Sequence, residues 1–79
     1  MKTQYLKVQA PAWSGDGLVD IAWYSITDEG TLAVWSNGAI MSFYVCPIEQ
    51  DIANGYQHTA ITRDEFENRL NMAIKKFIP

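Results

Sequence analysis

The chain closes with one strongly patterned helix, and the rest of the chain must supply the surface that this helix covers. Thr62 to Glu65 has the pattern of a capping box, in which the Thr62 hydroxyl accepts a hydrogen bond from the Glu65 amide. Apolar residues then recur at helical spacing and form one stripe: Phe66, Leu70, Ala73, Ile74 and Phe77. We therefore expect an amphipathic helix over residues 63–77 with a single buried face.

The chain before this helix has the pattern of an antiparallel sheet. Apolar and polar side chains alternate over residues 4–10 and 18–26, as in strands with one buried face. Residues 11–17, which lie between them, are rich in proline, glycine and small polar residues, so we expect a surface loop there. Two further strands are expected at residues 31–36 and 39–46.

The dipeptide Asn37-Gly38 joins the last two of these strands. It is the strongest short-range signal for a two-residue type I′ hairpin. A loop of this length also sets the register, because the side-chain period of a strand is two residues. The expected facing pairs are Ser36 with Ala39, Val34 with Met41, and Leu32 with Phe43.

The turn before this hairpin decides which face each residue of the preceding strand occupies. A four-residue turn over residues 27–30 places Ile21 and Trp23 on the face that holds Val34, and leaves Tyr24 on the other face. A three-residue turn with a bulge exchanges the two sets. We take the four-residue turn as the expected one.

Residues 48–60 carry no single clear pattern. Pro47 cannot donate to a strand ladder, so the fourth strand should end before it. Asn54-Gly55 would turn a second hairpin between short strands at 48–52 and 56–61, or the whole stretch would cross irregularly to the helix. Of these alternatives we expect a short fifth strand.

Together these elements predict an α+β domain, a meander of four or five antiparallel strands packed on one C-terminal amphipathic helix. A chain of 79 residues is large enough for one small hydrophobic core. Residues 1–79 are therefore expected to form a single domain, in which residues 1–61 make the sheet region and residues 62–79 the C-terminal helix.

One helix covers only one face of such a sheet, and the other face is also apolar. The expected register leaves four large side chains on that uncovered face: Tyr24, Trp35, Ile40 and Tyr44. Tyrosine and tryptophan give a large contact area with few rotatable bonds, which is typical of interfaces. Three arrangements would cover this face: a protein partner, a second copy of the chain, or residues 48–60 of the chain itself.

Trp13 lies alone among small and flexible residues in the first loop. It would either anchor a partner or cover the open edge of the core. Asp20 would stand beside the aromatic side chains of the uncovered face. The predicted partner-binding residues are therefore Trp13, Asp20, Tyr24, Trp35, Ile40 and Tyr44.

Acidic residues dominate the part of the chain before the helix. No lysine or arginine occurs between Lys7 and Arg63, whereas that interval contains Asp16, Asp20, Asp28, Glu29, Glu49 and Asp51. A basic cluster for phosphate contacts is missing there, so we expect no direct nucleic-acid binding. A partner with a basic surface would be attracted to this part of the chain. Scattered carboxylates also serve solubility alone.

Residue types that carry catalysis are scarce. Cys46 is the only cysteine and His58 the only histidine, so a Cys/His pair is the sharpest catalytic possibility. Cys46 follows an apolar strand, where a cysteine usually behaves as a small buried hydrophobe. Asp16 and Asp20 lack the further oxygen ligands of a calcium loop, and there is no cysteine set for zinc. We expect no enzyme, no cofactor and no metal.

The sequence thus predicts a small non-enzymatic protein–protein interaction module, an adaptor or an inhibitor. It would bind a partner with a basic surface through an aromatic and acidic sheet face, or pair with itself as a homodimer. Two alternatives stay open: a small enzyme or ligand-binding subunit that uses Cys46, His58 and nearby carboxylates, and a purely structural self-assembling subunit. The chain shows no signal-peptide pattern and no apolar run long enough to span a membrane, so we expect a cytoplasmic protein without membrane contact.

Overall fold

The computed structural model describes residues 3–77, which form five strands and two helices. In chain order these are β1 (Gln4–Pro11), β2 (Leu18–Thr27), β3 (Gly30–Trp35), β4 (Ile40–Phe43), α1 (Ile48–Ala53), β5 (Gln57–Ala60) and α2 (Arg63–Phe77). All five strands belong to one antiparallel sheet. The prediction of an α+β fold with an antiparallel meander sheet and a C-terminal helix is confirmed.

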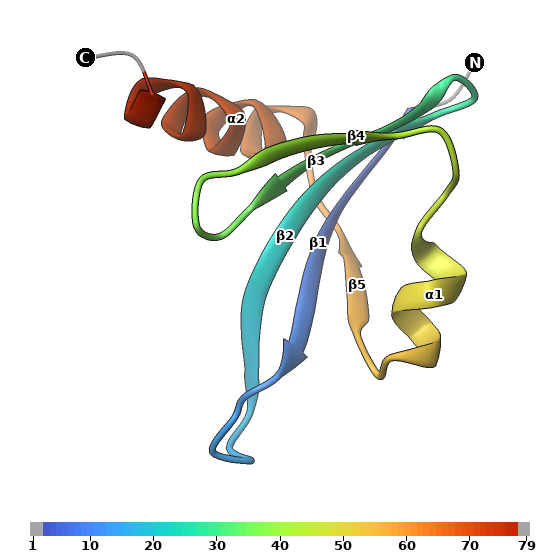
Figure 1. The fold of residues 1–79 in the computed structure, drawn as a ribbon, viewed down its shortest axis with the longest axis vertical. Helices are drawn as coiled ribbons and strands as arrows, with labels where there is room; N and C mark the ends of the chain where they lie inside the picture. Colours follow the sequence, from blue (N-terminus) through green and yellow to red (C-terminus); the bar gives the residue numbers. More distant parts are fainter. Residues whose placement is uncertain (1–2, 78–79) are drawn as a thin grey trace.

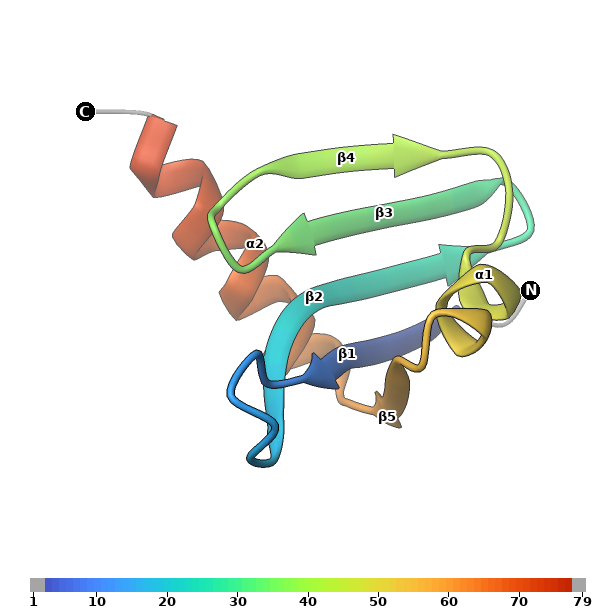
Figure 2. The ribbon, with the colours of Figure 1, turned by 60° about the horizontal axis from the view of Figure 1, so that its bottom comes forward.

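The strands lie in the order β4-β3-β2-β1-β5 (Figure 2). The first four follow one another as a meander, and β5 then returns to the opposite edge, beside β1. The crossing from β4 to β5 contains α1, and α1 and α2 lie on opposite faces of the sheet (Figure 1). The expected fifth strand is present, but residues 48–53 form a helix where a strand was one of the alternatives.

Helix α2 begins where the capping pattern predicts it. The Glu65 amide donates to Thr62 Oγ1 at 3.2 Å. Ile74 is partly exposed, and the side chain of Phe77 lies outside the described residues. The buried cluster between the helix and the sheet consists of Trp23, Val34, Phe66 and Ala73. The predicted amphipathic helix with one buried face is therefore confirmed.

A β-bulge bends the pair of strands β1 and β2. The register shifts between Val8 and Gln9, so Ile21 of β2 has no residue of β1 opposite it. The bulge turns Ile21 toward the core cluster on the α1 side. It also places Asp20 on the α2 side, where one carboxylate oxygen lies 3.8 Å from Lys7 Nζ. Regular alternation predicted the opposite face for both residues and is wrong here because of the extra residue.

The loop between β3 and β4 is not the expected two-residue turn. The Trp35 amide donates to the Ala39 carbonyl and the Gly38 amide donates to the Trp35 carbonyl, so the loop holds residues 36–38. A type I′ turn needs a positive φ at both central residues. Gly38 has one, at 94°, but Asn37 does not. The observed facing pairs are Val34 with Ile40, Ala33 with Met41, Leu32 with Ser42, and Thr31 with Phe43.

This one-residue shift exchanges the two faces of β4. Met41 and Phe43 lie on the α1 side of the sheet, whereas the expected register placed them under α2. Ile40 moves to the α2 side. The turn over residues 27–30, in contrast, has the expected length, and the placement of Trp23 on the α2 side is confirmed.

Candidate functional site

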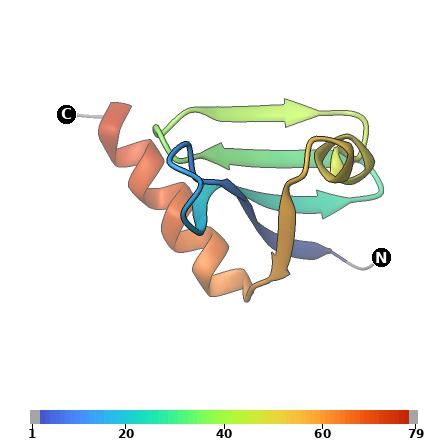
Figure 3. The ribbon, with the colours of Figure 1, turned by 90° about the horizontal axis from the view of Figure 1, so that it is seen from below.

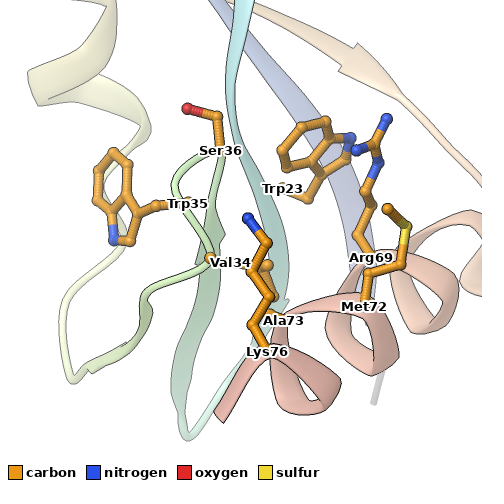
Figure 4. A pocket seen from close by; sticks show the side chains of 9 residues that line it. Trp23, Val34, Trp35, Ser36, Arg69, Met72, Ala73 and Lys76 are labelled. Carbon is orange, nitrogen blue, oxygen red and sulfur yellow. The ribbon is translucent and has the colours of Figure 1, made fainter.

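Two of the predicted binding residues belong to the core. Tyr24 is 1% exposed, and Ile48 of α1 and Tyr56 pack on the buried cluster that contains it. Trp35 is half-buried against the same cluster and points away from α2 (Figure 4). Of the three arrangements considered for this face, cover by residues 48–60 of the chain itself is the one observed over Tyr24.

The other four predicted residues are exposed, but they do not form one surface. Trp13 is fully exposed at the tip of the β1–β2 hairpin, which projects beyond the rest of the sheet (Figure 1), so it does not cover the core. Asp20 accepts a hydrogen bond from Gln9 at 2.8 Å on the α2 side. Tyr44 follows β4 directly and is 97% exposed. The expectation of one shared aromatic and acidic face is wrong, because the bulge between β1 and β2 moves Asp20 to the α2 side and the three-residue β3–β4 loop moves Ile40 there.

An exposed apolar strip follows the outer strand of the sheet. Strand β4 pairs with β3 on one side, and no other strand of residues 3–77 lies on its other side (Figures 2 and 3). We define residues 40–45 as the β4 edge. Its exposed large apolar side chains are Ile40, Met41, Tyr44 and Val45. The β4 edge therefore combines an open strand with apolar surface.

The β4 edge is also free of charge. The nearest charged residues in the sequence are Glu29 and Glu49, and residues 30–48 between them contain none. Natural proteins usually protect an edge strand with lysine, proline or inward-pointing charge, so that it does not pair with another chain. Strand β4 carries no such residue. Its chemistry thus suits the addition of another strand.

The direction of the backbone groups of β4 follows from its pairing with β3. Residues of an antiparallel pair alternate between hydrogen-bonded and non-hydrogen-bonded positions. The Trp35 amide donates to the Ala39 carbonyl, so Ala39 is a position whose backbone groups point toward β3. Every second residue repeats this direction, so the backbone groups of Met41 also point toward β3. The amide and carbonyl groups of Ile40 and Ser42 consequently point away from β3. These groups are the ones that an added strand would bond.

A second candidate site is a buried polar cluster beneath α1. The Tyr24 hydroxyl donates to Asp51 Oδ2 at 2.8 Å, and His58 Nε2 lies 3.0 Å from the same oxygen. The side chains of Asp51 and His58 are 9% and 11% exposed. The cluster connects α1 to β2 and β5. The sequence did not predict it, because Asp51 looks like one of several scattered acidic residues when only the sequence is known.

The Tyr24 hydroxyl gives this cluster a predicted pH dependence. Burial, and secondly the hydrogen bond to Asp51, raise the pKa of Tyr24 well above its ordinary value of about 10. Above about pH 10 the unfolded chain loses this proton while the folded chain keeps it, so stability falls as pH rises. The expected slope from this group is up to about 1.4 kcal/mol per pH unit. Urea unfolding of wild type and of Tyr24→Phe between pH 9 and 11 isolates the contribution of this hydroxyl. If the free energies of unfolding of the two proteins change in parallel with pH, the prediction is contradicted.

The residues of the alternative catalytic reading are not joined into a nucleophilic pair. Cys46 is exposed rather than buried, and His58 bonds Asp51. The hollow between α2 and the β3–β4 loop, next to the Arg69 guanidinium that lies 4.2 Å from the Trp23 ring centre, has a volume of about 50 Å³ (Figure 4). A second hollow, which Lys7 and Asp20 line on the other side of Trp23 and Arg69, has a volume of about 240 Å³. Ligand pockets usually measure about 300–1,000 Å³. Residues 3–77 contain no group of three or more histidine, cysteine or acidic side chains placed to hold a metal ion.

Comparisons of this chain with protein families, with curated proteins and with solved structures gave no match. Within the described residues, neither helix has the length and apolar character needed to cross a membrane.

Proposed function

We propose that this protein is a non-enzymatic protein-interaction module that binds an extended strand of its partner along the β4 edge. The observation that carries the proposal is the outer position of β4 together with its uncharged, apolar and exposed side chains. Main-chain hydrogen bonds would supply affinity in this mode, and alternate side chains would supply specificity. The buried Tyr24 cluster has a structural role in this proposal, because it holds α1 on the sheet.

The opposite edge of the sheet supports the choice of β4. Strand β5 connects directly to helices at both ends, and its exposed side chains include Gln57 and Thr59. Such polar residues give an added strand little apolar area to bury. The β4 edge instead offers Met41 at 47% and Val45 at 73% exposure. Apolar contact and free backbone groups thus coincide at β4.

A partner with basic residues fits the region beyond the end of β4. Asp28 and Glu29 form the turn between β2 and β3, and the adjoining Gly30 packs against the Phe43 carbonyl. Two carboxylates are therefore next in the chain to the residue that contacts the end of β4. A partner strand that carries lysine or arginine at this end would be attracted to them. This is the form in which we retain the prediction of a partner with basic residues.

A charge placed on the β4 edge is expected to weaken this binding. In Met41→Lys the ammonium group would lie opposite an apolar residue of the added strand and lose water, which lowers affinity at least about tenfold. The probe is a fluorescent peptide with the unchanged sequence of residues 39–45 and lysines added at both ends. Anisotropy titration at protein concentrations that keep the chain monomeric measures the affinity. The matched control is Met72→Lys on α2, where the methionine is 57% exposed.

A second variant tests the backbone part of the proposal. Ser42→Pro removes an amide that points away from β3, so the β3–β4 ladder keeps its bonds, as proline on an edge strand allows. We expect this variant to fold and to lose peptide binding. Equal affinity for wild type, Met41→Lys and Ser42→Pro, or no binding by wild type, would refute strand addition at β4.

A further inference from the structure

We infer that the strand that adds to the β4 edge is the β4 strand of a second copy of this chain, paired about a two-fold axis perpendicular to the sheet. This inference rests on the proposed function, since it names the partner of the same edge. Each copy has a net charge of −3, but residues 30–48 contribute nothing to it. Two such edges therefore meet without like charges opposite each other.

The two-fold axis restricts the register of the pairing. Facing residues of an antiparallel pair lie on the same side of the sheet, and successive residues alternate between sides. A residue of β4 in one copy therefore faces either the same residue of the other copy or a residue an even number of positions away from it. Pairing must also bring together the outward-pointing backbone groups, which belong to Ile40 and Ser42. A register centred on Ser42 meets both conditions.

The register centred on Ser42 also brings apolar side chains of β4 together. It sets Met41 of one copy against Phe43 of the other on the α1 side, and this pair occurs twice. A thioether against an aromatic ring is a favourable contact. A register centred on Phe43 would instead require residues beyond the bend at Tyr44 and Val45 to be extended.

A cysteine cross-link tests this register. In the Cys46→Ser background, Ser42→Cys would place two thiols on facing residues whose Cα atoms are about 5.5 Å apart, within disulfide range. Oxidised glutathione is the oxidant, and non-reducing electrophoresis measures the dimer. We expect this variant to form covalent dimers at least about tenfold faster than Thr59→Cys, which places an exposed thiol on β5 in the same background. Sedimentation velocity over a dilution series should show a dimer that dissociates, and Met41→Lys should stay monomeric.

The outcomes separate the two proposals. Equal cross-linking rates for Ser42→Cys and Thr59→Cys, with a monomer in sedimentation, overturn the second copy as the partner. If the lysine-flanked peptide still binds wild type in that case, strand addition at β4 stands with a different partner. A dimer that Met41→Lys leaves unchanged also overturns the inference, since the copies then meet elsewhere. If neither peptide binding nor cross-linking occurs, both proposals fail.

Discussion

Tyr24→Ala is expected to lower the free energy of unfolding by about 3–5 kcal/mol, the usual cost of removing a large buried side chain. Tyr24 is 1% exposed, is the largest fully buried side chain of the described residues, and donates to Asp51. The variant loses apolar contacts and leaves Asp51 with one partner fewer. A domain of 79 residues has a total stability of roughly 4–12 kcal/mol, so this loss is at least about a quarter of the total. Chemical denaturation followed by far-UV circular dichroism measures the loss.

Tyr44→Ala provides the matched control, since Tyr44 is the same residue type at 97% exposure. Its free energy of unfolding should stay within about 0.5 kcal/mol of wild type. Tyr24→Phe should fall between the two, because it keeps the ring and loses the hydrogen bond to Asp51. A similar loss for Tyr24→Ala and Tyr44→Ala would show that α1 does not cover this part of the sheet.

The second large effect is expected at the start of β3. Gly30 has a φ of 146°, and a Cβ atom there would lie 2.5 Å from the Phe43 carbonyl oxygen. Alanine therefore meets backbone that must move, in a conformation that L-residues rarely adopt. We expect Gly30→Ala to lower the free energy of unfolding by about 2–4 kcal/mol. Because β4 must shift to make room, the variant should also cross-link more slowly when combined with Ser42→Cys.

Gly55→Ala separates backbone conformation from steric overlap. Gly55 has a φ of 83°, and a Cβ atom there would meet nothing within 4 Å. Its replacement should cost only the left-handed backbone penalty, about 1 kcal/mol. Urea denaturation of both variants under the same conditions gives the difference. Equal losses of unfolding free energy for Gly30→Ala and Gly55→Ala would mean that the Phe43 carbonyl moves aside at little energetic cost.

The parts of the fold that depend on local signals could be predicted from the sequence. Thr62 and the apolar stripe that follows it define α2 almost alone, since capping and helical periodicity act over a few neighbouring residues. The hairpin was predicted in place but not in register. Asn37-Gly38 fits a two-residue loop as well as a three-residue loop with glycine at the positive φ, and the sequence does not separate them.

The errors arise where pairing with a distant segment decides the structure. The bulge at Ile21 depends on the position of β1 against β2, whereas alternation along β2 itself is regular. Helix α1 has six residues, too few for a clear helical period. The candidate site inherits both errors, because the bulge moves Asp20 to the other face and α1 buries Tyr24. The Tyr24–Asp51 bond spans 27 positions in the chain, so no local pattern announces it.

The order of the strands also decides where an assembly of this protein stops growing. If two copies join through β4, both outer edges of the combined sheet are β5 strands, and neither copy has an exposed β4 edge left to pair with a third copy. Such an arrangement is closed, like other isologous pairs. A head-to-tail union of β4 with β5 would leave a β4 strand free after every step and extend into a filament. Because the chain places β5 rather than a second apolar strand at its far border, we expect discrete pairs and no fibres.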